Sequence, residues 1–193
     1  MRQSKGKYLV SPKIVSLLGK QKSVRIALIK DYEDDPKVLL TTEQKGIVYN
    51  SLPGGKVNPS EYKNNKSIDH AFTVTLAREL EEELGLPQKQ FFRCVRNLVS
   101  YLDFAILTKF DKVNPLSEVV FYGLLADEVL EKLDLGGQSD TKIVSYNWVP
   151  LRKILGNFRI EDQNQFLPQG VFIFVDDHIP GILERLSEKL SSE

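Results

Sequence analysis

The segment that most constrains this chain is a run of regularly spaced apolar residues with a built-in stop. In "AFTVTLARELEEELGLP" an apolar side chain recurs every fourth residue, which predicts a helix with one buried face. The recurring residues are Phe72, Leu76, Leu80 and Leu84. Gly85 suits the position just after a helix, and Pro87 cannot continue one. We therefore expect a helix that begins near Ser67 and ends before Gly85.

The same helix carries four glutamates within five residues. On a helical wheel Glu79, Glu82 and Glu83 fall within an arc of about 100°, whereas Glu81 points roughly the opposite way. Two like charges about 5 Å apart repel by about 3 kcal/mol at an effective dielectric constant near 20. Three carboxylates beside a buried face must therefore bind a cation or take up protons, and oxygen ligands favour Mg²⁺ or Mn²⁺. The alternative is an acidic helix face exposed to solvent.

A glycine-rich turn, "LPGGKV", precedes this helix at the end of a predicted strand, residues 47–57. Glycines there can bring backbone carbonyl and N–H groups close to a metal and to phosphates. Arg78, next to Glu79, can pair with a carboxylate and hold it in place. A glycine turn followed by Arg-Glu and paired glutamates indicates a site for a metal and phosphates.

Together these residues resemble the signature sequence of the Nudix hydrolases. That signature reads Gly, five residues, Glu, seven residues, then Arg-Glu-apolar-any-Glu-Glu-any-Gly-apolar. Gly55, "KVNPS" and Glu61 match its first spacing, and residues 78–86 match its second half at every position. Sixteen residues separate Glu61 from Arg78, so we interpret 62–70 as a nine-residue insertion in a polar surface loop. In strict register His70 would replace the first glutamate of the signature, and we expect it to be a loop residue at the start of the helix.

The resemblance implies the α/β Nudix fold, an α/β/α sandwich with a mixed β-sheet. It also implies hydrolysis of a diphosphate linked to another group, with Mg²⁺ or Mn²⁺ as cofactor. By matching position, Glu82, Glu83 and the Gly54 carbonyl are expected to bind the metal. Glu79 is expected to be a further ligand or the base, oriented by Arg78.

Other residues are expected to contact the substrate or complete the metal site. The substrate-binding candidates are Gly54, Gly55, Lys56 and Tyr101. Tyr101 could stack on a nucleobase, although packing in the core is the simpler alternative. Relatives often take a further carboxylate from a later loop, for which Asp140 is the first candidate and Glu118 the second. For each of them, an ordinary surface acid is the simpler alternative.

The rest of the chain predicts a mixed sheet covered by helices. Strand-like stretches are expected at 23–31 and 37–44, as a hairpin, and at 47–57, 91–107, 117–126 and 143–151. Helices are expected at 127–133 and at 179–190, where the apolar residues are spaced for one buried face.

The charge is uneven, although the whole chain is neutral. The first thirty residues hold eight basic and no acidic residues. We assign 1–22 to a basic N-terminal extension and 23–193 to the Nudix domain. The extension is either solvated or a patch that attracts phosphates, such as an RNA 5′ end.

No apolar run is long enough to span a membrane, so no membrane partner is expected. A single cysteine, Cys94, excludes an internal disulfide and favours the cytoplasm. The expected partner is a nucleotide-type small molecule, with an RNA 5′ end and a homodimer as open alternatives. Nucleotides, nucleotide sugars, dinucleoside polyphosphates and RNA 5′ ends are all candidate substrates. The alternative function is an inactive Nudix-fold module that binds nucleotides or RNA.

Overall fold

Helices and strands occur in groups along the chain in the computed structural model. It describes residues 21–31, 34–45, 47–64, 68–97, 104–108, 116–124, 133, 143–160, 172–174 and 178–192. In chain order the elements are β1 (Gln21–Lys30), β2 (Lys37–Lys45), β3 (Ile47–Ser51), β4 (Gly54–Lys56), α2 (Pro59–Asn64), α3 (Ile68–Leu84), α4 (Gln88–Asn97), β5 (Phe104–Thr108), β6 (Leu116–Leu124), β7 (Ile143–Pro150), α6 (Leu151–Gly156), β8 (Phe158–Ile160), β9 (Phe172–Phe174) and α7 (His178–Leu190).

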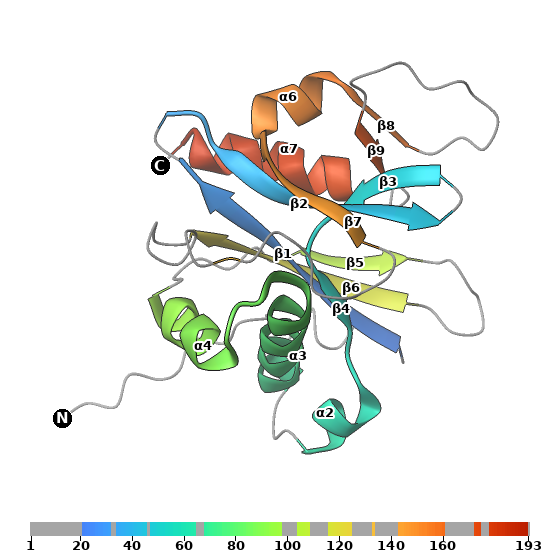
Figure 1. The fold of residues 1–193 in the computed structure, drawn as a ribbon, viewed down its shortest axis with the longest axis vertical. Coiled ribbons are helices and arrows are strands. Elements are labelled where there is room, and N and C mark those ends of the chain that lie inside the picture. The colour runs from blue at the N-terminus through green and yellow to red at the C-terminus, as the bar shows by residue number, and fades with distance from the viewer. Residues whose placement is uncertain are drawn as a thin grey trace.

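The strands form one mixed sheet, as predicted. Its order is β5-β6-β1-β2-β3-β9-β8, with β4 beside β1 and β7 beside β2 (Figure 1). β1 runs parallel to β6 and antiparallel to β4, whereas β2 runs antiparallel to both β3 and β7. The predicted β1–β2 hairpin is confirmed next to its turn, where Ile29 pairs with Val38 and Lys30 with Lys37.

Alternate residues of the central strands face two separate cores. On β1, Val24, Ile26 and Leu28 pack with residues of α3 and α4, while Ala27 and Ile29 pack with residues of α6 and α7. Successive side chains of a strand point to opposite faces, so a strand that is apolar on both faces must be covered on both. Figure 1 shows the two groups of helices with the sheet between them. The predicted α/β/α sandwich is confirmed.

Helix α3 ends where the sequence places its stop. Leu80 and Leu84 are fully buried against the sheet. Gly85 has φ +64°, and its N–H donates to the Glu81 carbonyl over 3.1 Å. A side chain at this left-handed position would be strained, so the glycine both closes the helix and allows the chain to turn.

The prediction of a strand over 91–107 is wrong for residues 91–97, which belong to helix α4. The Pro87 carbonyl accepts hydrogen bonds from the N–H groups of Gln90 and Phe91 and so begins the helix. Phe91 is buried in the core beside α3, whereas Lys89 is exposed. The adjacent apolar residues suggested a buried strand, but one turn of helix also places Phe91 inward and the basic residues outward. The second half contains β5.

Two other predicted elements are changed. The strand over 47–57 is two strands, β3 and β4, because the chain turns at Pro53 and Gly54. The interval 62–70, predicted as a polar surface loop, contains the end of α2 and the start of α3. Residues 65–67 lie outside the described residues.

Other predictions are confirmed or lie outside the described residues. The strands over 117–126 and 143–151 and the helix over 179–190 correspond to β6, β7 and α7, whereas α6, β8 and β9 were not predicted. Most of 127–133 and all of 1–20 are outside the described residues, and β1 includes 21 and 22. The boundary between extension and domain at residue 23 stays a prediction. Within the described ranges, none of the helices has the length and apolarity needed to cross a membrane.

Candidate functional site

Strand β4 brings two glycines against β1 and α3. Gly54 has φ +135°, and a Cβ there would collide with the Val24 carbonyl and the Arg25 Cα atom. At Gly55 a Cβ would collide with the carboxylate of Glu79. The first glycine is thus needed for the backbone conformation, and the second lets the carboxylate lie directly over the backbone.

The turn between β3 and β4 is fastened to β1 by backbone hydrogen bonds. The Ile26 N–H donates to the Pro53 carbonyl and the Val57 N–H to the Lys22 carbonyl, both over 2.9 Å. Because β1 lies inside the sheet, between β6 and β2, these bonds give the glycine turn a fixed position beside α3.

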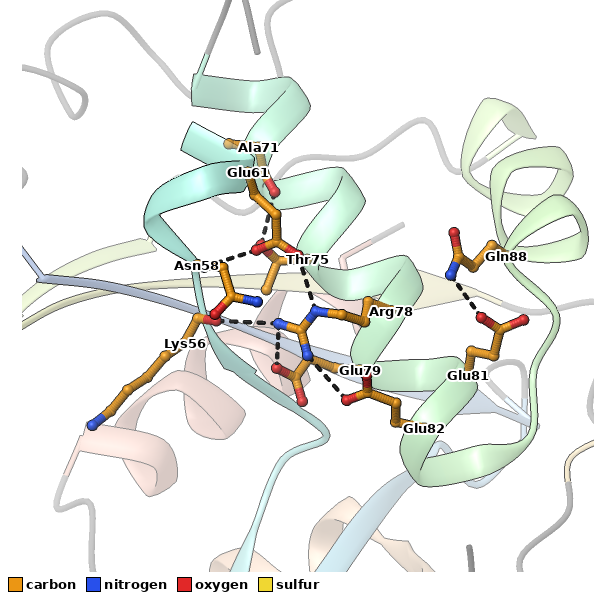
Figure 2. Close-up of polar contacts among 10 residues, drawn as sticks. All are labelled: Lys56, Asn58, Glu61, Ala71, Thr75, Arg78, Glu79, Glu81, Glu82 and Gln88. Carbon is orange, nitrogen blue, oxygen red and sulfur yellow. Dashed lines mark hydrogen bonds and ion pairs between the residues drawn. The ribbon is translucent and has the colours of Figure 1, made fainter. Parts of the chain in front are cut away.

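Arg78 is the centre of the polar network on α3, which Figure 2 shows. Its Nε is 2.9 Å from Glu61 Oε1, its Nη2 is 2.8 Å from Glu79 Oε1, and its Nη1 is 3.0 Å from Glu82 Oε2. Nη2 also donates to the Lys56 carbonyl on β4 over 3.3 Å. The sequence predicted that Arg78 would hold one carboxylate. It holds three, and it joins the helix to the glycine turn.

Glu61 reaches this network because it lies on helix α2, which contacts α3. Helix α2 carries Glu61, whose Oε2 accepts hydrogen bonds from the Asn58 N–H over 2.8 Å and the Thr75 hydroxyl over 2.9 Å. Burial acts to raise the pKa of Glu61, but the hydrogen bond from Arg78 and those from Asn58 and Thr75 lower it below its ordinary value. Glu61 is therefore an anion fully occupied with protein donors, which suits it to fix Arg78.

Glu79 and Glu83 have the opposite electrostatic character. Burial raises the pKa of Glu79, against the opposing effect of the Arg78 charge. Burial also raises the pKa of Glu83 to about 8; the hydrogen bond from the Gly54 N–H acts to lower it, and the charge of Glu79 adds to the rise. The Gly54 N–H donates to Glu83 Oε2 over 3.1 Å. These two carboxylates bind a proton or another cation more readily than an exposed glutamate does.

The wheel separates the remaining two glutamates correctly. Glu82 lies on the Arg78 side of the helix, with 58% of its side chain exposed. Glu81 is exposed and accepts a hydrogen bond from Gln88 Nε2 at the start of α4 over 2.6 Å. Figure 2 shows Glu81 pointing away from Arg78 toward Gln88. The prediction that Glu81 stands apart from the other three is confirmed.

The other candidate residues are only partly placed. Lys56 is exposed, and its side chain extends away from the Arg78 network in Figure 2. His70 is an exposed residue in the first turn of α3. The backbone of Glu118 lies in β6 opposite Ser23. Tyr101 and Asp140 lie outside the described residues.

Sequence reasoning missed three residues of this site. Asn58 and Thr75 hold Glu61, and Arg25 on β1 donates to the Leu52 carbonyl over 2.8 Å. The signal for Arg25 was available, since it is a lone charge in the otherwise apolar stretch 24–29. Thr75 gave no comparable signal, because it contacts Glu61 only through the packing of α2 on α3. The Asn58 contact is local: Asn58 directly precedes α2, and its N–H donates to Glu61 three residues later, a spacing typical of the start of a helix.

The donor atoms suit a hard divalent cation, although they do not enclose one as they stand. In the part of the chain that the structure describes, no three acidic, histidine or cysteine side chains converge as a metal-binding group. Glu79 and Glu82 are turned onto Arg78 instead. Glu79 and Glu83 nevertheless offer partly buried carboxylates of raised pKa beside a backbone turn, and carboxylate oxygens are what Mg²⁺ and Mn²⁺ bind in proteins.

Comparison with known proteins gives one family. The model of the NUDIX domain matches residues 19–169. Among curated proteins none matches the sequence.

Solved structures with the same fold extend over most of the chain. One is a C. elegans Ap4A hydrolase in a binary complex, with a TM-score of 0.57 at 14% identity. The match covers 89% of this chain and 98% of the hydrolase chain. A mutT/nudix family protein from Listeria innocua has a TM-score of 0.51 at 18% identity, covering 90% and 94%. The NUDIX domain of Shewanella oneidensis NrtR, complexed with ADP ribose, has a TM-score of 0.50 at 16% identity, covering 93% of each chain. At these identities the likeness shows the fold alone.

Proposed function

Because the chain belongs to the NUDIX domain family and is a hydrolase acting on phosphoric anhydride bonds, we propose that it cleaves nucleoside diphosphates linked to another group, with Mg²⁺ or Mn²⁺ as cofactor. The observation that carries the proposal is the joint position of Glu79 and Glu83. One lies over the Gly55 backbone, and the other accepts the Gly54 N–H. This places two carboxylates of raised pKa at a backbone turn suited to phosphate.

Glu82, Glu83 and the Gly54 carbonyl are the groups we assign to the cation, and Glu79 is the carboxylate that we assign as the base. When bound, a divalent cation neutralises the charge that spreads over the phosphoryl oxygens during hydrolysis. Glu82 is the most exposed of the three carboxylates and can leave Arg78 at little cost, since an exposed ion pair contributes about 0–1 kcal/mol.

Arg78 prepares Glu79 for proton transfer. By holding Oε1 of Glu79 it fixes the direction of Oε2, the atom that we assign as acceptor of a proton from the attacking water. Burial raises the pKa of Glu79, so its carboxylate is a stronger base than one in bulk water. Glu61 neutralises Arg78 from the other side, so that Arg78 does not withdraw all of that basicity.

Lys56 is the residue that we assign to binding a phosphate group of the substrate. It follows Gly55 directly, its side chain is exposed, and it extends away from the carboxylates. Two of the structural neighbours carry the names of nucleotide compounds, Ap4A and ADP ribose. We propose that this chain also acts on a nucleotide-type substrate. An RNA 5′ end is a longer substrate with the same kind of phosphate linkage. We further propose that the protein is cytoplasmic, because it has a single cysteine.

A substrate panel tests the proposal. Purified protein is incubated with Mg²⁺ or Mn²⁺ and a nucleoside triphosphate, a nucleotide sugar, a dinucleoside polyphosphate or a capped RNA, and products are separated by chromatography. We expect cleavage of at least one phosphoric anhydride bond, and Glu79→Gln should abolish it. If the wild type cleaves none of them but binds one with micromolar affinity, the chain is an inactive binding module instead.

A further inference from the structure

Arg25 is a charged, partly buried residue on β1, an inner strand of the sheet. Its neighbours Val24 and Ile26 on β1 are buried in the core. Its Nη1 donates to Ser51 Oγ over 2.5 Å and to the Leu52 carbonyl over 2.8 Å. Both acceptors belong to residues that are almost completely buried. A partly buried guanidinium is costly unless it is hydrogen-bonded, and here its partners are the last residues before the glycine turn.

Three consecutive residues of the turn are therefore tied to β1. Ser51 and Leu52 accept from the Arg25 side chain, and the Pro53 carbonyl accepts from the Ile26 N–H. The next residue is Gly54, whose N–H is directed at Glu83 Oε2. The direction of that N–H depends on the peptide plane between Pro53 and Gly54, since this bond is planar. Whatever fixes the preceding residues thus fixes the donor to Glu83.

The electrostatic environment of Glu83 also connects it with Arg25. The positive charge of Arg25 acts to lower the pKa of Glu83, against burial and against the charges of Glu79 and Glu43. Arg25 is thus close enough to influence the carboxylate that its hydrogen bonds help to position. A lysine would supply a charge, but only one compact ammonium in place of a planar group that reaches two acceptors.

We propose that Arg25 is a positioning residue: by holding Ser51 and Leu52 it orients the Gly54 N–H that fixes Glu83 in the active site. Its effect on turnover rests on the proposed function, whereas its effect on Gly54 does not. Arg25 contacts neither substrate nor the reacting atoms in this role.

Three variants test the assignment. Arg25→Met keeps the apolar stem of the side chain without its donors, and Arg25→Lys keeps the charge without the planar guanidinium. Arg152→Met is the matched control, because Arg152 binds Asp35 on the exposed surface of α6. Hydrogen exchange of the Gly54 amide is followed by NMR on the ¹⁵N-labelled protein without metal or substrate. kcat and KM are then measured with the best substrate of the panel.

For Arg25→Met we expect exchange at Gly54 to be about tenfold faster, as for loss of one or two hydrogen bonds. We expect kcat to fall about tenfold or more while KM changes by less than about threefold, since positioning acts on the transition state. Arg25→Lys should recover part of both effects, and Arg152→Met should change neither. If Arg25→Met does not fold, Ser51→Ala removes one acceptor and should raise the exchange rate of Gly54 by a smaller factor.

Unchanged exchange at Gly54 in a folded Arg25→Met variant, or in Ser51→Ala where that replaces it, overturns the proposal. Faster exchange with an unchanged kcat also overturns it, because Arg25 would then hold the turn without serving the reaction. If the wild type hydrolyses nothing in the panel, the proposed function fails. The exchange data still decide whether Arg25 fixes Gly54.

Discussion

Arg78 Nε lies 2.9 Å from Glu61 Oε1, although sixteen residues separate the two along the chain. Helix α2 makes this possible, because it returns the chain to α3 after β4. The carboxylate also accepts from the Thr75 hydroxyl, one turn before Arg78 on the same helix. The extra residues of the signature are therefore compatible with a Glu–Arg contact, with 62–64 in α2 and 68–70 in α3.

This contact predicts a structural cost for Glu61→Gln. The amide removes the negative charge opposite Arg78 and offers only one acceptor oxygen to three donors. Because the pair is partly buried, we expect the free energy of unfolding to fall by roughly 1–3 kcal/mol. Urea denaturation of the wild type and the variant measures it. A variant as stable as the wild type would show that Asn58 and Thr75 alone hold this part of α2.

The length of the inserted segment gives a second prediction. Deleting 62–70 would remove the end of α2 and the first turn of α3, together with the link between Glu61 and Thr75. We expect the melting temperature to fall by at least several degrees, as a loss of 1–2 kcal/mol does in a domain of this size. Circular dichroism on heating measures it. An unchanged melting temperature would restore the simpler view of a surface loop.

The different positions of Glu81 and Glu82 predict unequal effects on activity. Glu82→Gln removes a proposed metal ligand on the Arg78 side, and we expect kcat/KM to fall about a hundredfold or more. Glu81→Gln leaves the network untouched and should retain activity within a few fold, since Glu81 contacts Gln88. Steady-state kinetics on both variants checks this, and equal losses would contradict the assignment of Glu82.

The raised pKa of Glu83 predicts how stability depends on pH without metal. Its folded pKa of about 8 lies above the ordinary value, so the folded state holds a proton that the unfolded state has lost. The contribution of Glu83 to the free energy of unfolding is therefore present at low pH, and it is lost as pH rises from about 5 to 8. Urea denaturation in EDTA across this range should show the decline, and Glu83→Gln should flatten it. Mg²⁺ or Mn²⁺ should raise the melting temperature, most strongly at the alkaline end.

The basic N-terminal residues predict a difference between short and long substrates. Lys5, Lys7, Lys13 and Lys20 precede the first described strand, and Lys22 is left unchanged because it lies in β1. Replacing the four lysines by glutamine should leave small-nucleotide hydrolysis within a few fold. Cleavage at an RNA end should fall much further, with a weaker dependence on salt. If the variant cleaves both substrates as fast as the wild type does, the RNA 5′ end is removed from the candidate substrates.

Much of the fold can be predicted from local patterns in the sequence. Leucines at every fourth position produce α3, Gly85 ends it, and strands apolar on both faces lead to a sheet covered by helices. Helix α4 was missed because Phe91 and Phe92 satisfy a strand pattern as well as a helix. Only the hydrogen bonds that begin at Pro87, together with packing beside α3, decide between the two.

For the site, the sequence by itself determined which residues of α3 share a face, because helical geometry fixes their angles. It separated Glu81 from Glu82 and placed Arg78 beside Glu79 without any tertiary contact. Only the tertiary structure decided what those side chains meet. Glu61 and Arg25 come from other elements, and their distances to Arg78 and Leu52 depend on how α2 and β1 pack. Their influence on Glu79 and Glu83 depends in turn on burial, because a charge removed from water interacts more strongly with its neighbours.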